Sequence, residues 1–78
     1  MQHYETIKVK YQKRIGIISL NRPKVLNAIN NKMIDEVTDV IAKLNSEPNV
    51  ACIIINGEGR CFSAGFDMKE AAERSIKG

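Results

Sequence analysis

Residues 57–67 read Gly57-Glu58-Gly59-Arg60-Cys61-Phe62-Ser63-Ala64-Gly65-Phe66-Asp67, and the rest of the chain is organised around this stretch. It follows the most apolar run of the sequence, 50–55, and precedes a charged segment typical of a short helix, 66–75. A buried strand, a Gly-rich turn and a helix start together place backbone N–H groups at the positive end of a helix. The glycines permit positive φ angles and close approach of a ligand to the main chain. This pattern predicts either a binding loop or a plain connection.

The run 50–55, Val-Ala-Cys-Ile-Ile-Ile, shows no alternation and predicts a strand covered on both faces. Upstream, residues 31–45 predict a helix that begins with a cap from Asn30 or Asn31 and ends at Asn45. Its apolar stripe consists of Met33, Ile34, Val37, Val40, Ile41 and Leu44. Its polar face, which we expect to be solvated, consists of Lys32, Asp35, Glu36, Asp39 and Lys43. Strand, helix and strand at this spacing predict a right-handed crossover into a parallel pair, and hence an α/β fold.

The first twenty residues predict a hairpin. Residues 4–11 alternate, with Ile7, Val9 and Tyr11 on one face and Lys8 and Lys10 on the other, as in a half-buried strand. A turn at 12–13 leads to a more apolar and therefore more central strand, 14–20, whose glycine at 16 indicates a bulge or a close neighbour. After Pro23, the segment 24–29 is too short for a helix and too apolar for an exposed loop, so we expect it to pack over the core or to line a pocket.

Length and charge bound the class of protein. The 78 residues are enough for one small domain at most, so we expect the chain either to oligomerise or to be part of something larger. The net charge is +3, and the few aromatic residues do not interleave with the basic ones, which argues against nucleic-acid binding. Neither a signal peptide nor a run of about 18 apolar residues is present, so no membrane partner is expected. Cys52 and Cys61 lack metal-ligand spacing and are expected to be free thiols. We therefore expect a soluble, cytoplasmic protein without a metal.

The chemistry that the stretch 57–67 favours is electrophilic. Ser63, Ala64 and Gly65 are too small to block the main chain, and the following helix would aim the Phe66 N–H at an anion or a polarised carbonyl, as in an oxyanion hole. Asp67, in the first helical turn, suits the helix dipole. From spacing alone, a plain strand-to-helix turn explains the pattern equally well. Ser63 lacks a histidine partner, since His3 is the only histidine, and no phosphate-loop motif or acidic pair is present.

Three motifs, in this order and spacing, resemble the enoyl-CoA hydratase/isomerase (crotonase) family over nearly the whole chain. They are Gly16-Ile17-Ile18-Ser19-Leu20-Asn21-Arg22-Pro23 with Leu26-Asn27-Ala28, then Ile53-Ile54-Ile55-Asn56-Gly57, and then Cys61-Phe62-Ser63-Ala64-Gly65-Phe66-Asp67-Met68-Lys69-Glu70. The resemblance implies a crotonase-like spiral of ββα units, of which 1–78 is the N-terminal part. It also implies a homotrimer or hexamer.

The resemblance further implies an acyl-CoA thioester substrate whose carbonyl oxygen lies between two backbone N–H groups, the first from Phe66. Arg22 or Lys24 would meet a phosphate. No metal or organic cofactor is implied, because coenzyme A is part of the substrate. The other residues implied to border coenzyme A are Lys24, Val25 and Leu26 before the loop, and Ala64, Asp67, Met68 and Lys69 within and after it.

Two departures from the family pattern matter. Phe66 stands where hydratases often have Ala or Gly, which leaves the N–H in place but puts the acyl pocket in doubt. The family's second donor and catalytic carboxylates lie beyond Gly78, so we expect 1–78 alone to be inactive. The favoured reaction is hydration of 2-enoyl-CoA. Open alternatives are an isomerase or thioester hydrolase, a non-catalytic acyl-CoA binder or structural subunit, and a general anion-binding module.

Overall fold

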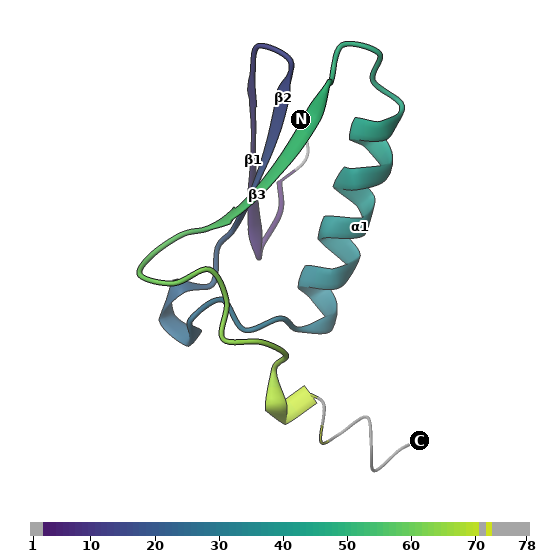
Figure 1. Ribbon diagram of the computed structural model, residues 1–78. Helices are drawn as coiled ribbons and strands as arrows, with labels where there is room; N and C mark the ends of the chain where they lie inside the picture. The colour runs from purple at the N-terminus through teal and green to yellow at the C-terminus, as the bar shows by residue number, and fades with distance from the viewer. Residues whose placement is uncertain (1–2, 71, 73–78) are drawn as a thin grey trace.

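The computed structural model describes residues 3–70 and 72 (Figure 1). Strands β1 (Ile7–Gln12) and β2 (Ile15–Leu20) are followed by a 3-10 turn η1 (Pro23–Val25), helix α1 (Asn31–Asn45) and strand β3 (Cys52–Gly57). The sheet order is β1-β2-β3, with β1 and β2 antiparallel and β2 and β3 parallel. The predicted α/β class and the strand–helix–strand crossover into a parallel pair are therefore confirmed. β1, β2 and α1 form one ββα unit.

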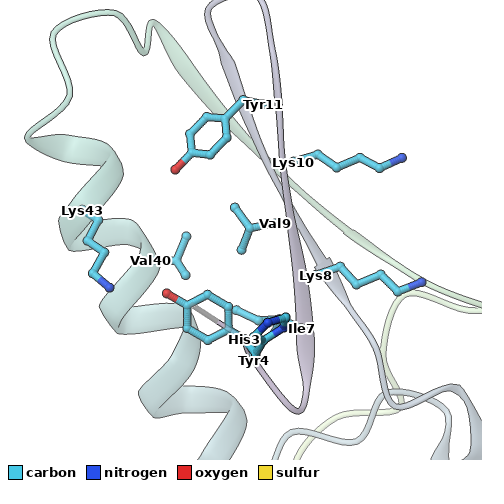
Figure 2. A pocket seen from close by; sticks show the side chains of 9 residues that line it. All are labelled: His3, Tyr4, Ile7, Lys8, Val9, Lys10, Tyr11, Val40 and Lys43. Carbon is cyan, nitrogen blue, oxygen red and sulfur yellow. The ribbon is translucent and has the colours of Figure 1, made fainter. Parts of the chain in front are cut away.

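The hairpin keeps the predicted alternation. Figure 2 shows Ile7, Val9 and Tyr11 on the side of β1 that faces α1, where they line a hollow of about 720 Å³, whereas Lys8 and Lys10 point away. The turn lies one residue later than predicted, at 13–14, because Gln12 already pairs with Ile15. Lys13 adopts a φ of 56°, which lets two residues reverse the chain.

The core lies between α1 and the sheet. Buried Met33, Val40 and Leu44 on α1 pack with Ile7, Ile18 and Leu20 on the strands. The Asn30 side chain caps the helix by accepting a hydrogen bond from the Met33 N–H at 2.9 Å. Gly16 marks a close neighbour and not a bulge: the pairing register runs through it unbroken, and a Cβ there would lie 2.8 Å from Leu44 Cδ1.

Strand β3 departs from its prediction in position and in burial. It begins two residues later than expected, because Val50 closes a turn by donating to the Glu47 carbonyl. Ile54 and Ile55 are 43% and 40% exposed, so the expected coverage on both faces is wrong for the described residues. The reason is topological: β3 is an edge of this sheet, and α1 covers one face only (Figure 1).

Glu36 is the second correction, because it is buried rather than solvated. Its carboxylate accepts hydrogen bonds from the Glu5 N–H at 2.9 Å, the Thr6 N–H at 2.8 Å and the Thr6 hydroxyl at 2.6 Å. Burial raises the pKa of Glu36, but these hydrogen bonds outweigh it, and the pKa lies below its ordinary value of 4.5. The carboxylate thus fastens the segment before β1 to the middle of α1.

We expect Glu36→Gln to destabilise the protein by about 1–2 kcal/mol near neutral pH, because the amide replaces one accepting oxygen with a donor. A carboxyl whose pKa is lowered on folding stabilises the protein above its ordinary pKa, and this contribution is lost as pH falls through the folded value. The difference from wild type should therefore shrink below about pH 4.5. Urea unfolding at pH 7 and pH 3.5 measures this difference, with the exposed Glu47→Gln as the matched control. A difference that does not change with pH would contradict the prediction.

Among the described residues, no helix has the length and apolar character needed to cross a bilayer. The helix predicted over 66–75 begins at 68, with helical residues at 68–70 and 72. Residues 71 and 73–75 of that prediction lie outside the described part of the chain.

Candidate oxyanion loop and its clamp

Two loops, 22–29 and 58–67, meet at one end of the sheet (Figure 1). The first loop follows β2 and the second follows β3. The last residues of these two strands, Leu20 and Gly57, pair with each other. Parallel strands bring their carboxyl ends to the same edge, which is where ligands bind in open α/β sheets. The segment 24–29 is thus hydrogen-bonded to the Gly-rich stretch. Its last residue, Ile29, packs against the core and lines a hollow, as expected for the segment, whereas Lys24 and Val25 are exposed.

Asn27 joins the two loops. It is fully buried and adopts a φ of 54°, a left-handed conformation that Asn tolerates better than most residues. Its side-chain carbonyl accepts from the Arg22 N–H at 2.7 Å, and its amide nitrogen donates to the carbonyls of Glu58 and Cys61 at 2.8 and 3.0 Å. All the polar atoms of this side chain are therefore paired, the oxygen within the first loop and the nitrogen to the second.

A second connection runs through Ser63. Its hydroxyl donates to the Asn27 carbonyl at 2.8 Å and accepts from the Gly65 N–H at 3.0 Å. The hydroxyl proton is therefore committed to a structural contact, which agrees with the lack of a base partner in the sequence. Ala64 adds a backbone link, because its N–H donates to the Leu26 carbonyl at 2.8 Å.

Phe66 forms a single parallel bridge with Ile29. The Ile29 N–H donates to the Gly65 carbonyl at 2.8 Å, and the Asp67 N–H donates to the Ile29 carbonyl at 2.7 Å. In a parallel bridge these bonds use the residues on either side of Phe66, so its own N–H points away from Ile29. Within residues 3–70 and 72 this N–H donates to no hydrogen bond. The bridge to Ile29 thus holds the Phe66 N–H in place as an available donor.

The glycines of the stretch serve two purposes. Gly59 and Gly65 adopt φ angles of 88° and 104°, as expected for positions that require glycine. Gly57 does not belong to this group. It is the last residue of β3, and a Cβ there would lie 2.5 Å from the Phe62 carbonyl oxygen, so it is needed for close backbone packing.

Asp67 caps the helical turn from outside rather than lying within it. Its Oδ1 accepts from the N–H groups of Lys69 and Glu70 at 3.1 and 3.3 Å, while its Oδ2 lies 3.5 Å from Arg22 Nη1. The same Nη1 donates to the Ala28 carbonyl at 2.6 Å. The Nη1 of Arg22 is therefore engaged within the protein, whereas Lys24, the other residue considered as a phosphate partner, is exposed.

The predicted site residues lie on both loops and around the bridge. Lys24 and Val25 are exposed on η1, and Leu26 ends η1 in a left-handed conformation. Ala64 and Phe66 lie on the second loop, with the Phe66 side chain 68% exposed. Met68 and Lys69 are exposed in the helical turn that Asp67 caps. The backbone hydrogen bond from Ala64 to Leu26 and the bridge between Phe66 and Ile29 tie the two groups together.

Asn27 is absent from the predicted site residues, although it carried a signal. An amide within the apolar segment 24–29 must find hydrogen-bond partners if the segment is buried. Which groups those partners are depends on the second loop, more than thirty positions later. Because these partners are distant in sequence, the hydrogen bonds that Asn27 makes between the two loops could not be predicted.

Three acidic side chains near the loop have fixed partners. Glu58 pairs with Lys8 at 3.2 Å, Asp67 with Arg22, and Glu70 accepts from the Asn31 N–H at 2.7 Å. None is left as an obvious proton-transfer group. Cys52 and Cys61 are free thiols, and no three His, Cys, Asp or Glu side chains of the described residues are grouped as a metal ion would require.

An apolar hollow of about 260 Å³ opens beside the two loops, between α1 and the end of the sheet. It is lined by Leu20, Ile29, Met33, Ile34, Val37, Thr38, Ile55 and Phe62. The hollow of Figure 2 lies instead along β1, and its lining contains none of the predicted site residues.

Residues 10–77 match the sequence model of the family described as enoyl-CoA hydratase/isomerase. A probable enoyl-CoA hydratase echA8 of Mycobacterium bovis is 47% identical over 70 residues, which are 90% of this chain and 27% of the relative. The mitochondrial 3-hydroxyisobutyryl-CoA hydrolase of Rattus norvegicus is 39% identical over 80 residues, covering 99% of this chain and 21% of the relative. The chain therefore spans about a quarter of the length of these curated relatives.

The fold comparison agrees. A crystal structure of an enoyl-CoA hydratase subunit from Geobacillus kaustophilus HTA426 superimposes with a TM-score of 0.88 at 33% sequence identity. The match covers 92% of this chain and 28% of that chain. The ββα unit and the strand after it are thus those of a crotonase-like fold.

Proposed function

Since the chain belongs to the enoyl-CoA hydratase/isomerase family, we propose that the whole protein acts on acyl-CoA thioesters and adds water to a 2-enoyl-CoA. The observation that carries the proposal is the Phe66 N–H, which makes no hydrogen bond within the described residues while both of its neighbours are held by Ile29. A fixed donor of this kind suits a carbonyl oxygen that gains negative charge during a reaction.

In the proposed reaction the oxygen of water bonds to C3 of the enoyl group and a proton is delivered to C2 from the same side. The electrons of the C2=C3 bond move toward the thioester, and the carbonyl oxygen carries negative charge in an enolate-like state. The Phe66 N–H stabilises that charge in the transition state, where one such donor supplies about 2.7–4 kcal/mol. The second donor and the proton-transfer groups come from elsewhere in the whole protein.

The exposed side chains around the bridge fit the rest of the substrate. Val25, Ala64 and Met68 are exposed and offer apolar surface to a pantetheine arm, and the half-buried Leu26 accepts a backbone hydrogen bond from Ala64. Lys24 and Lys69 are exposed cations that suit phosphate groups. Asp67 acts through its cap on the helical turn. Coenzyme A is part of the substrate, and we propose assembly as a homotrimer or hexamer.

Thioester hydrolysis is the second candidate, because the rat relative named as a 3-hydroxyisobutyryl-CoA hydrolase matches 99% of this chain. Hydrolysis uses the same donor, since attack at the carbonyl carbon also places negative charge on the carbonyl oxygen. The two reactions differ in product: hydration leaves the thioester intact, whereas hydrolysis releases the coenzyme A thiol.

An assay of the whole protein with crotonyl-CoA decides between them. We expect saturable loss of the conjugated enoyl-thioester absorbance, with 3-hydroxybutyryl-CoA as product and no release of thiol. Release of thiol in step with turnover would establish the hydrolase instead. Failure to bind or convert crotonyl-CoA, longer 2-enoyl-CoA thioesters and saturated acyl-CoA thioesters would refute the proposal, and tight binding of inorganic phosphate alone would favour an anion-binding module.

A further inference from the structure

The guanidinium of Arg22 holds both segments of the bridge that presents the donor. Its Nη1 donates to the Ala28 carbonyl at 2.6 Å and lies 3.5 Å from Asp67 Oδ2. Ala28 directly precedes Ile29 and Asp67 directly follows Phe66, and Ile29 and Phe66 form the bridge. The two side chains of the ion pair are 22% and 21% exposed, so water screens the pair only in part.

The contact also reaches the helical turn behind the donor. Asp67 uses its other oxygen, Oδ1, to accept from the N–H groups of Lys69 and Glu70. The Asp67 carboxylate is therefore held from two directions, and with it the backbone just after Phe66. The Phe66 N–H itself lies in the preceding peptide, whose Gly65 carbonyl accepts from the Ile29 N–H. The Ile29 N–H shares a peptide with the Ala28 carbonyl that Arg22 holds. Without the Arg22 side chain, Asp67 Oδ2 and the Ala28 carbonyl, which directly precedes Ile29, would each lose this partner.

We infer that Arg22 is a positioning residue that sets the direction of the Phe66 N–H, acting through Asp67 and Ala28; this inference rests on the proposed function. Arg22 itself contacts no substrate in this account. Because a misplacement of about 1 Å in a reacting group lowers rates by up to about 10²-fold, a partly loosened donor should cost about tenfold in kcat. KM should change less than threefold, since the binding surface remains.

The test uses the whole protein with Arg22→Gln, Arg22→Lys, Asp67→Asn and the double variant Arg22→Gln/Asp67→Asn. For each we measure kcat and KM with crotonyl-CoA, the thermal unfolding midpoint, and the absorption shift of bound 2,4-hexadienoyl-CoA, whose conjugated thioester reports carbonyl polarisation. The matched control is Arg14→Gln, because the exposed Arg14 side chain donates to the Asn49 carbonyl at the opposite end of the sheet from the two loops.

We expect Arg22→Gln to lower kcat about tenfold and to reduce the absorption shift, while Arg22→Lys, which keeps the charge but not the planar fork, recovers part of both. The double variant should be no worse than Arg22→Gln, because the two residues act in one chain of contacts. Wild-type kcat and absorption shift in Arg22→Gln, or strictly multiplicative losses in the double variant, would overturn the inference. If Arg22→Gln does not fold, Arg22→Lys and Asp67→Asn decide by the same criteria.

The design separates this inference from the proposed function. If the wild-type protein neither shifts the absorption of the dienoyl thioester nor converts crotonyl-CoA, the proposed function fails, and the inference with it. If wild type does both and the Arg22 variants do so equally well, only the positioning role is wrong.

Discussion

Replacing Phe66 with proline is expected to lower kcat/KM of the whole protein for 2-enoyl-CoA by about 10²–10³-fold, because proline has no backbone N–H and so removes one oxyanion donor. The substitution breaks no hydrogen bond among residues 3–70 and 72, because the Phe66 N–H has no acceptor there. Gly65 at the preceding position leaves room for the proline ring. Steady-state kinetics of the folded variant, checked by circular dichroism, measure the effect.

Phe66→Ala is the matched control, because it keeps the N–H and removes only a side chain that is 68% exposed. We expect its kcat to stay within a few fold of wild type, while its preference among acyl chain lengths changes. Wild-type turnover in a folded Phe66→Pro protein would exclude the Phe66 N–H as the donor. A loss of the same size in Phe66→Ala would assign the effect to the side chain.

Asn27→Ala is expected to cost about 3 kcal/mol of unfolding free energy, because it leaves the Arg22 N–H and the carbonyls of Glu58 and Cys61 without their partners. The residue is fully buried, so water reaches these groups only if the loops separate. Urea unfolding of the whole protein measures the loss. Activity should fall together with stability, because the Asn27 main-chain carbonyl holds the Ser63 hydroxyl, which in turn accepts from the Gly65 N–H.

Two variants test whether the amide itself matters. Asn45→Ala removes an exposed Asn at the end of α1 and should change stability by less than about 0.5 kcal/mol. Asn27→Asp keeps the acceptor for Arg22 but faces two carbonyls with a carboxylate oxygen, so it should destabilise at least as much as Asn27→Ala. An Asn27→Asp protein as stable as wild type would show that the loops are held together by packing and not by this amide.

Local pattern accounts for the elements that formed as predicted. The stripe from Met33 to Leu44 has the period of a helix, and Asn30 supplies a cap that depends only on its neighbours, so the bounds Asn31–Asn45 follow from the sequence. The alternation of Ile7, Val9 and Tyr11 likewise sets which side of β1 faces α1. Such signals act within a few residues and do not require knowledge of the fold.

The corrections share a different cause. Glu36 has the spacing of a solvated residue, yet it is buried because the Glu5–Thr6 segment crosses α1 and brings three donors to its carboxylate. The run 50–55 is apolar enough for a covered strand, yet β3 is an edge of the described sheet. In both cases the environment is set by a partner distant in sequence, and periodicity carries no information about such partners.

The same division applies to the stretch 57–67. The sequence by itself determined that this is a Gly-rich turn after an apolar strand, and its motifs were sufficient to indicate the enoyl-CoA hydratase/isomerase family. The sequence also pointed to the Phe66 N–H, but only the tertiary structure shows what holds it, which is the bridge to Ile29 together with the contacts of Asn27 and Arg22 to the second loop. Hydrogen bonds between residues about thirty to forty positions apart become defined only when β2 and β3 bring their ends together.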